Sequence, residues 1–280
     1  MEEQRAKIFS ITNQKGGVGK TTTAVNLAAS LAATGRKILL VDLDPQGNAS
    51  MGCGVDKHQL DVSLYEVLTS RCDINQALCQ GLECRFDLLP SNGDLTAAEV
   101  ELLEAENKEF QLKEKLSELA TPYDFIFIDC PPSLNMLTVN ALVASHAVLV
   151  PIQCEYYALE GLSALMNTIA TVAENINPDL EIEGLIRTMY DPRNSLTNDV
   201  SEQLARHFGD RVYRTAIPRN VRLAEAPSHG MPVLMYDPAS KGAKSYLALA
   251  GELLRRENAF APDQLEDSVS SSERFNMTEA

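Results

Sequence analysis

The segment Lys15-Gly-Gly-Val-Gly-Lys-Thr-Thr22 connects a mostly apolar run, Ile8 to Ile11, with an alanine-rich segment, Ala24 to Ala33. The first run is typical of a buried strand and the second of a helix. A glycine-rich loop between a strand and a helix turns backbone N–H groups inward, beside the positive end of the helix dipole. The sequence therefore predicts a phosphate-binding loop made of Lys15, Gly16, Gly17, Val18, Gly19, Lys20, Thr21 and Thr22.

This loop departs from the usual phosphate-loop pattern at its first position. The pattern G-x-x-x-x-G-K-[ST] requires glycine at residue 14, where the chain has Gln14, and a second lysine, Lys15, follows. Lys20 is the lysine expected to contact the β- and γ-phosphates. Two interpretations of Lys15 are open: a solvated surface lysine, or a cation that reaches a nucleotide on a second subunit, as an arginine finger does.

Two further apolar runs end in aspartate, at Asp42 and Asp129. Near-continuous apolar runs are typical of strands in a parallel sheet that is covered on both faces. The carboxyl ends of such strands meet at one edge, where ligands bind. We expect Asp42 and Asp129 to hold water ligands of an Mg²⁺ ion that Thr21 binds directly. Asp44, just past the strand end, is expected to orient a water molecule on the γ-phosphate.

The rest of the chain alternates between strand and helix patterns. We predict strands over residues 7–13, 37–42, 85–90, 123–129, 147–153, 181–188 and 212–217. Helical patterns cover residues 21–33, 62–68, 74–79, 95–119, 135–146, 157–175, 196–208 and 241–258. This alternation predicts an α/β fold with a mostly parallel, doubly wound sheet flanked by helices, in a single P-loop ATPase domain over residues 1–258. The acidic, serine-rich segment 259–280 has too few apolar residues to offset ordering entropy, so we predict a disordered tail.

Composition excludes several classes of protein. The chain has 280 residues and a net charge of −15, which argues against a general nucleic-acid coat but permits a local basic patch. No apolar run is long enough to span a bilayer, and Met1 to Arg5 lacks the apolar core of a signal peptide. We therefore expect a cytoplasmic protein with no membrane partner. Its six cysteines match no C-x-x-C pattern and are expected to be free thiols.

Four motifs together resemble the ParA/Soj family of chromosome-partitioning ATPases. They are the loop at residues 15–22, Val41-Asp-Leu-Asp-Pro-Gln-Gly-Asn-Ala-Ser50, Phe127-Ile-Asp-Cys-Pro-Pro-Ser133 and Ile217-Pro-Arg-Asn-Val-Arg-Leu-Ala-Glu-Ala-Pro-Ser-His-Gly230. The resemblance covers residues 7 to about 256 and implies an ATPase with a deviant Walker A loop that uses ATP and Mg²⁺.

The same resemblance implies roles for particular residues. Two subunits would enclose ATP in a homodimer, with Lys15 reaching the partner's nucleotide. Lys20 and Thr21 would bind phosphate and Mg²⁺, and Asp44 would support hydrolysis. Adenine would lie against four residues of two loops: Met189, Pro218, Arg219 and Asn220.

Two partners are also implied by the resemblance. ATP binding would drive dimerisation and non-specific binding to double-stranded DNA, and a ParB-type DNA-binding protein would stimulate hydrolysis and release the DNA. Such a protein is a switch for chromosome or plasmid partitioning and associates with the nucleoid. The sequence offers candidate DNA contacts in its C-terminal half, of which Arg193 and Arg222 are the first choices: Arg193, Arg219, Arg222, Lys241 and Lys244.

Other functions share this loop. A positioning ATPase of the same family for another cargo remains an alternative. A membrane-associated ATPase like the MinD cell-division regulators would carry a basic amphipathic helix at its C-terminus, whereas residues 259–280 are acidic. An iron–sulfur protein like the nitrogenase iron protein needs cysteines that bridge a cluster between subunits, and Cys130 and Cys154 lack the matching glycine context.

Overall fold

The structure is a computed structural model of the chain that describes residues 6–260 with the exception of Tyr157. Of the predicted tail, residues 259–280, all but the first two positions lie outside the described residues. Six strands form one sheet in the order β3-β2-β4-β1-β5-β6, and every neighbouring pair is parallel. They are β1 (Lys7–Ile11), β2 (Ile38–Asp42), β3 (Asp87–Leu89), β4 (Phe125–Asp129), β5 (Ala147–Gln153) and β6 (Glu181–Thr188).

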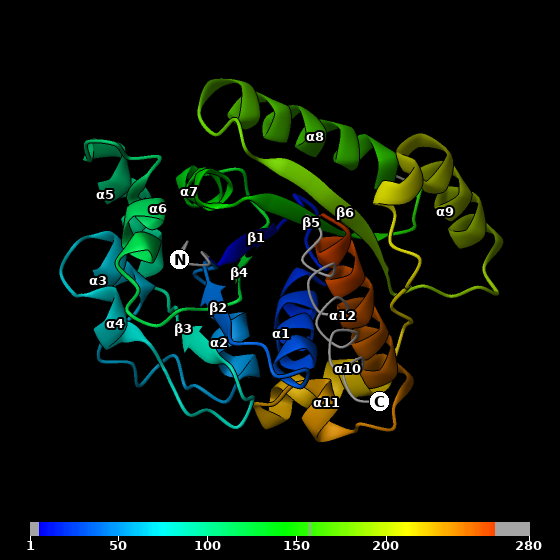
Figure 1. The fold of residues 1–280 in the computed structure, drawn as a ribbon, viewed down its shortest axis with the longest axis horizontal. Coiled ribbons are helices and arrows are strands. Elements are labelled where there is room, and N and C mark those ends of the chain that lie inside the picture. Colours follow the sequence, from blue (N-terminus) through cyan, green and yellow to red (C-terminus); the bar gives the residue numbers. More distant parts are fainter. Residues whose placement is uncertain (1–5, 157, 261–280) are drawn as a thin grey trace, which may run out of the picture.

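Helices cover both faces of this sheet, which confirms the predicted doubly wound architecture (Figure 1). One face packs against α1 (Lys20–Ala32), α2 (Asn48–Gly52), α10 (Val221–Glu225), α11 (Val233–Tyr236) and α12 (Lys241–Phe260). The other packs against α3 (Leu64–Leu68), α4 (Ile74–Ala77), α5 (Leu95–Glu104), α6 (Gln111–Ser117), α7 (Met136–Ala144), α8 (Ala158–Asn175) and α9 (Ser195–Phe208). No helix among residues 6–260, Tyr157 aside, is long and apolar enough to cross a membrane.

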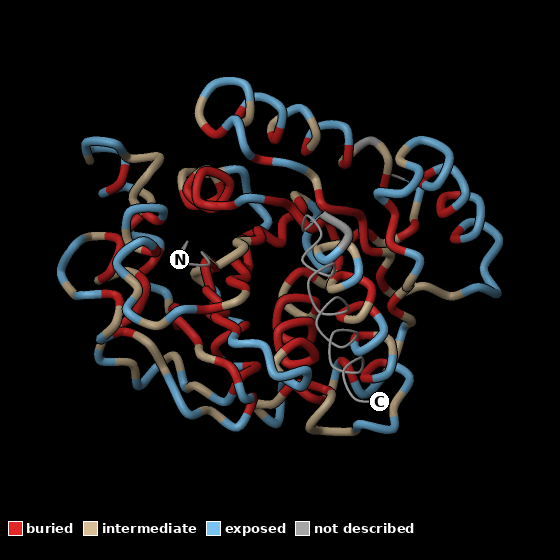
Figure 2. Tube along the Cα trace, in the orientation of Figure 1, coloured by how far each residue is buried: buried red, intermediate tan, exposed pale blue. Residues whose placement is uncertain are grey.

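Burial along the central strands explains their apolar sequences. Every residue of β2 and β4 is buried, and the adjacent Leu39 and Leu40 pack into clusters on opposite faces of the sheet. Figure 2 shows this buried layer in the middle of the molecule. The exceptions to the apolar pattern are Asp42 and Asp129 at the ends of these strands, and both are fully buried. Since burying a carboxylate is costly, they indicate a functional site.

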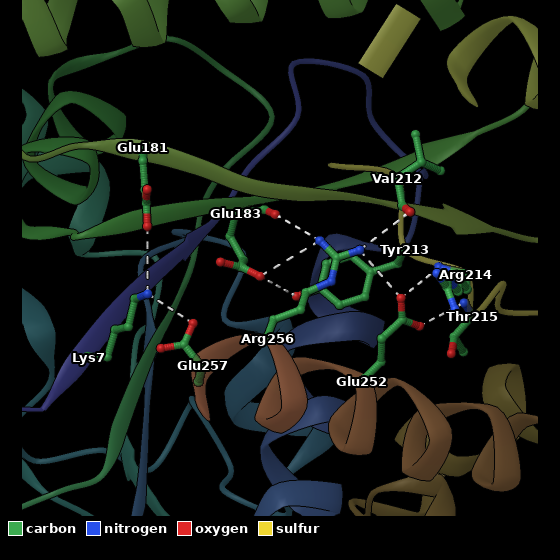
Figure 3. Close-up of polar contacts among 10 residues, drawn as sticks. All are labelled: Lys7, Glu181, Glu183, Val212, Tyr213, Arg214, Thr215, Glu252, Arg256 and Glu257. Atoms are coloured by element: carbon green, nitrogen blue, oxygen red, sulfur yellow. Dashed lines mark hydrogen bonds and ion pairs between the residues drawn. The ribbon is translucent and has the colours of Figure 1, made fainter. Parts of the chain in front are cut away.

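The predicted strand over residues 212–217 is wrong. The segment runs beside β6, to which one isolated bridge joins it, from Val212 to Leu185, and a second bridge joins Pro218 to Tyr190 just past the ends of both. Between the bridges, the Glu252 carboxylate of α12 accepts hydrogen bonds from the amides of Arg214 (2.7 Å) and Thr215 (2.9 Å) (Figure 3). The Arg187 guanidinium donates to two carbonyls of the segment at 2.8 and 3.0 Å. Side chains therefore replace the ladder that a seventh strand would have formed.

Three short helices had no counterpart in the prediction, namely α2, α10 and α11. Each has four or five residues, which is too short for a periodic pattern. Helix α2 begins after Gly47, whose backbone is left-handed (φ 59°) and whose added Cβ would lie 2.7 Å from the Ser91 carbonyl oxygen. This turn brings Ser50 back to Asp42, at the edge of the sheet where the candidate site lies.

Candidate nucleotide-binding site

The glycine-rich loop joins β1 to α1 at the carboxyl edge of the sheet. Gly17 and Gly19 have left-handed backbones, with φ of 73° and 90°, which a side chain would strain. Gly19 caps α1 without a side-chain hydrogen bond. The cap residue therefore supplies no side-chain acceptor to the first amides of the helix, which suits the binding of an anion at this helix start. The Thr188 hydroxyl, at the end of β6, donates to the Val18 carbonyl at 2.7 Å and holds the loop against the sheet.

Lys20, the first residue of α1, is buried with 7% exposure. Its ammonium donates to the Lys15 carbonyl at 3.3 Å, so its hydrogen bond goes to a neutral acceptor and not to a carboxylate. Burial lowers the pKa of Lys20, while the charges of Asp129 and Asp44 act in the opposite direction. A buried ammonium whose hydrogen bond goes to a neutral carbonyl is suited to bind an anionic ligand such as a phosphate group.

Asp42 lies beside Asp129, because the two are register partners on β2 and β4. One Asp42 oxygen accepts hydrogen bonds from the amide and the hydroxyl of Ser50, both at 2.8 Å, and the other accepts from the Asp44 amide at 3.3 Å. Burial raises the pKa of Asp42 to about 7, although the bonds from Ser50 oppose the rise. Asp42 is thus fixed in orientation by α2.

The carboxylate of Asp129 differs from that of Asp42 in its hydrogen bonding. Both of its carboxylate oxygens are buried, and neither has a hydrogen-bond partner of normal geometry in the part of the chain that the structure describes. Burial and the neighbouring charge of Asp42 raise its pKa well above the ordinary value, whereas Thr21 and Lys20 oppose the rise. Orphaned buried acceptors require an explanation, and water ligands of a bound cation would supply the missing donors.

Asp44 lies past the end of β2, with 8% of its surface exposed. One carboxylate oxygen accepts from the Gln46 amide at 2.9 Å. Its carbonyl accepts from the Gly47 amide and from the Ser91 hydroxyl, both at 2.8 Å. The backbone around Asp44 is therefore held from two sides, and among the described residues the Gln46 amide is the hydrogen-bond donor to its carboxylate.

Lys15 forms an ion pair within its own chain. Its ammonium lies 2.6 Å from a carboxylate oxygen of Glu155, which follows β5, and the two side chains are 43% and 46% exposed. The Lys15 amide donates to Asn13, whose side chain in turn donates to the Pro151 carbonyl at 2.8 Å. The backbone of the loop start is therefore anchored to β5, while the Lys15 side chain lies at the surface.

A pocket of about 180 Å³ lies next to the loop. It contains all four residues to which the family resemblance assigns adenine contacts, from the turns after β6 and after residue 217. Met189 has a left-handed backbone there, with φ of 49°. Tyr246 of α12 closes the pocket beside α1, where its hydroxyl bonds to Thr23. The lining is Gly19, Thr22, Thr188, Met189, Ile217, Pro218, Arg219, Asn220, Leu223, Ala224 and Tyr246.

The candidate DNA contacts differ in their surroundings. Arg193 is 88% exposed but is held by Asp191 at 2.8 Å, and this hydrogen bond lowers the pKa of Asp191 to about 2. Arg222 pairs with two carboxylates: Glu225 at 2.7 Å and Asp237 at 3.3 Å. The other three candidates are exposed, and no ion pair to a described residue holds them: Arg219, Lys241 and Lys244.

Sequence reasoning assigned no role to four residues that shape this site. Ser50 positions Asp42, and Ser91 positions Asp44. Glu155 pairs with Lys15, and Tyr246 lines the pocket. Ser50 stands inside the motif that begins at Val41, so its position was visible although its role was not. The other three come from distant segments, and only the fold brings them to the loop.

Comparisons with known proteins agree with this geometry. A family model described as an AAA domain matches residues 6–182. The chromosome partitioning protein ParA of Myxococcus xanthus is 51% identical over 91% of this chain and 90% of its own length. The chain belongs to the ParA/Soj family of chromosome-partitioning ATPases. The sporulation initiation inhibitor protein Soj of Bacillus subtilis is also 51% identical, over 88% of this ParA/Soj chain and 98% of its own.

The fold of this ParA/Soj family member is also similar to that of solved structures. Cobyrinic acid a,c-diamide synthase of Mycobacterium smegmatis, with bound ATP analogue and magnesium, superposes with a TM-score of 0.80. The two chains are 38% identical, and the match covers 91% of this chain and 96% of the synthase. The ParA/Soj chain is therefore a P-loop ATPase in fold and in family.

Proposed function

We propose that this ParA/Soj family member is an ATP-dependent switch for partitioning a chromosome or plasmid. ATP binding drives formation of a homodimer that binds DNA without sequence preference, and hydrolysis releases the DNA. One observation carries the nucleotide part of the proposal. The buried ammonium of Lys20 and the buried carboxyls of Asp42 and Asp129 converge beside the glycine-rich loop without neutralising one another through close contacts.

The residues of the site fit Mg²⁺-ATP. The orphaned oxygens of Asp129 suit water ligands of a cation, with Asp42 as the second acceptor and Thr21 as the direct ligand. Bound Mg²⁺ supplies positive charge to the phosphate oxygens. Lys20 contacts the β- and γ-phosphates from the helix start, and Asp44 orients the attacking water. The adenine occupies the pocket of about 180 Å³ between the loops.

Lys15 links the nucleotide to dimerisation. In the proposed dimer its ammonium leaves Glu155 and contacts the phosphates on the partner subunit. An exposed ion pair contributes only about 0–1 kcal/mol, so breaking it costs little compared with a contact to a triphosphate. In the single subunit, Lys15 is therefore held by a weak ion pair, which it can leave when a partner subunit brings ATP.

The proposed partners follow from the family and from charge. Double-stranded DNA binds through its phosphates to basic residues of the C-terminal half, and a ParB-type protein stimulates hydrolysis. This cycle places the protein on the nucleoid. The net charge of −15 supports a dependence on dimerisation, because a single subunit attracts DNA weakly.

Sedimentation of the Asp44→Ala protein, with and without ATP and with plasmid DNA, tests the proposal. Without the water-orienting carboxylate, ATP should bind, the dimer should persist and hydrolysis should slow by at least about a hundredfold. DNA should then co-sediment only in the presence of ATP. Lys20→Ala is the matched control, which should bind no ATP and remain a single subunit.

Two outcomes would contradict the proposal at different points. If Asp44→Ala hydrolyses ATP at the parental rate, Asp44 does not orient the water. If DNA co-sediments equally with and without ATP, the nucleotide does not control DNA binding.

A further inference from the structure

A second hollow, of about 880 Å³, lies between β6, the short helix η1 (Gly209–Arg211), the segment 212–215 and the last turns of α12. Figure 3 shows part of its wall, where side chains of α12 contact the segment. Five arginines line the hollow, although the chain has a net charge of −15. They are Arg187, Arg211, Arg214, Arg255 and Arg256.

Three of these arginines have no carboxylate partner among the described residues. Arg211, Arg214 and Arg255 are exposed, and no ion pair or side-chain hydrogen bond to residues 6–260 holds their guanidinium groups. We call them the rim arginines. One comes from η1, one from the segment 212–215 and one from α12, so three separate elements bring unpaired positive charge to the same hollow.

The carboxylates of the hollow are mostly engaged with other groups. Glu252 accepts from two backbone amides as well as from Arg256. Glu183 accepts from a buried tyrosine hydroxyl at 3.0 Å, and Glu181 pairs with the lysine at the start of β1 at 3.7 Å. Among the described residues Asp210 is the one lining acid without such a partner. Three unpaired rim arginines therefore surround a single unpaired carboxylate.

Helix α12 brings the next part of the chain to this hollow. The helix ends at Phe260, and Arg255 precedes that end by five residues, or about 7.5 Å of helix. Residues 261–280, which lie outside the described residues, follow directly. Seven residues cover up to about 23 Å when extended, which is enough to reach back from the end of the helix to the rim arginines.

Residues 261–280 carry the opposite charge to the rim arginines. They contain five carboxylate side chains and one arginine, and three of the carboxylates stand within seven positions of Phe260, namely Asp263, Glu266 and Asp267. Carboxylates bind guanidinium groups through two parallel hydrogen bonds. A single exposed pair is weak, but a segment on the same chain is present at an effective concentration in the millimolar range. The tether therefore favours this segment over a separate acidic partner.

We propose that the hollow between β6, η1 and α12 binds the chain's own acidic segment, residues 261–280, through the rim arginines. The three carboxylates nearest to α12 supply the contacts. The bound segment then links η1, the segment 212–215 and α12 to one another. This contact needs neither ATP nor DNA, so its failure would leave the proposed function untouched.

Labelling of the full chain with phenylglyoxal, which reacts with arginine side chains, tests the contact. The parent is compared with the variant Asp263→Asn, Glu266→Gln, Asp267→Asn, and the labelling rate of each arginine is measured by mass spectrometry. At low salt the rim arginines of the variant should react at least about threefold faster, because the tethered carboxylates no longer cover them. At 1 M salt, where the Debye length is about 3 Å, the two proteins should react equally.

The control variant removes the same number of negative charges elsewhere, through Glu104→Gln, Glu106→Gln and Glu114→Gln. These side chains are exposed and lie in or between α5 and α6, away from the hollow (Figure 1), so the rim arginines should react as in the parent. Arg85 is the internal reference, since it is exposed and precedes β3 at the opposite edge of the sheet from β6. Its rate should be the same in all three proteins.

Three results would overturn the proposal. Equal labelling of the rim arginines in the parent and in the Asp263, Glu266 and Asp267 variant at low salt would show that the acidic segment does not occupy the hollow. A difference that persists at 1 M salt would show that charge pairing is not the cause. Protection that increases with protein concentration would assign the contact to the acidic segment of a second subunit, whereas a segment of the same chain gives protection that does not depend on concentration.

Discussion

At the residue scale, the site gathers carboxyl groups that the folded chain does not neutralise by close pairing. Burial raises the pKa of Asp42 to about 7 and the pKa of Asp129 well above its ordinary value. In the unfolded chain both groups release their protons near 3.8. The unfolded state thus binds fewer protons than the folded state above that pH, so stability falls as the pH rises toward the raised pKa values.

Asp129→Asn should reduce this pH dependence. The parental protein, without nucleotide or Mg²⁺, should lose stability from about pH 5 to about pH 8, by up to about 1.4 kcal/mol per pH unit for each group in its titration window. The asparagine variant removes one of the two groups, so its free energy of unfolding should fall less steeply. Urea unfolding at a series of pH values measures both slopes.

Asp179→Asn provides the control, since Asp179 is exposed and lies outside the site. Its pH dependence should equal that of the parent. Equal slopes for Asp129→Asn and the parent would show that Asp129 is ionised in the folded protein, and its buried oxygens would then need another source of stabilisation.

Local chemistry explains which site residues the sequence could predict. The loop from Lys15 to Thr22 is recognisable because a phosphate cradle is built from consecutive backbone groups. Asp42 and Asp129 are recognisable because each ends a buried apolar strand. The ion pair of Lys15 with Glu155 was not predictable, since it joins two exposed side chains 140 positions apart that meet only after β1 and β5 pair.

At the scale of elements, one carboxylate holds the segment 212–217 in place. Glu252 of α12 accepts from the Arg214 and Thr215 amides and from Arg256. Glu252→Ala leaves these donors without their acceptor, which should cost about 2–4 kcal/mol in the free energy of unfolding. The segment leads to the nucleotide pocket at Ile217, so the Kd for ATP should also rise.

Urea unfolding and ATP titration of the purified variant measure the two effects. Glu202→Ala is the matched control, because Glu202 pairs with Arg206 at 2.8 Å on the exposed face of α9. An exposed pair of this kind should contribute less than about 1 kcal/mol. If Glu252→Ala costs no more than Glu202→Ala, the segment is held by packing and not by the carboxylate.

The same segment shows where prediction of elements from sequence reaches its limit. Residues 212–217 contain enough apolar and aromatic positions for a strand, yet the amides of Arg214 and Thr215 bond to a side chain 38 and 37 positions away. The hydrophobic pattern of a sequence indicates which residues are buried, but it does not indicate which acceptor a backbone amide will bond to. Strand β2 and helix α9 were predicted close to their observed bounds, since their periodicity is set by burial on one or both faces. The helical pattern predicted over residues 95–119 is instead divided into α5 and α6, with residues 105–110 outside both helices.

At the scale of the whole molecule, the proposed control of DNA binding acts through the number of subunits that are joined. The nucleotide pocket is lined by residues of the phosphate loop, the end of β6 and α12, among them Gly19, Thr188 and Tyr246. In the proposed switch ATP changes DNA affinity by joining two subunits, and no contact between ATP and DNA is needed.

The salt dependence of DNA binding should then report the oligomeric state. If a single subunit neutralises about three phosphates, the slope of log K against log salt is about −2.7, and a dimer that neutralises six gives about −5.4. Joining two weak surfaces also raises their effective concentration, so affinity should increase more than twofold. Asp44→Ala with ATP should show the steep slope, whereas the same protein with ADP should show the shallow one.

Lys15→Gln separates dimerisation from nucleotide binding in this measurement. The variant keeps Lys20 and should bind ATP, but it lacks the ammonium that reaches the partner's nucleotide. Its slope with ATP should therefore stay near the single-subunit value. A steep slope for Lys15→Gln would mean that the dimer forms without the second lysine of the loop, whereas equal slopes with ATP and ADP for Asp44→Ala would mean that joining two surfaces is not what controls DNA affinity.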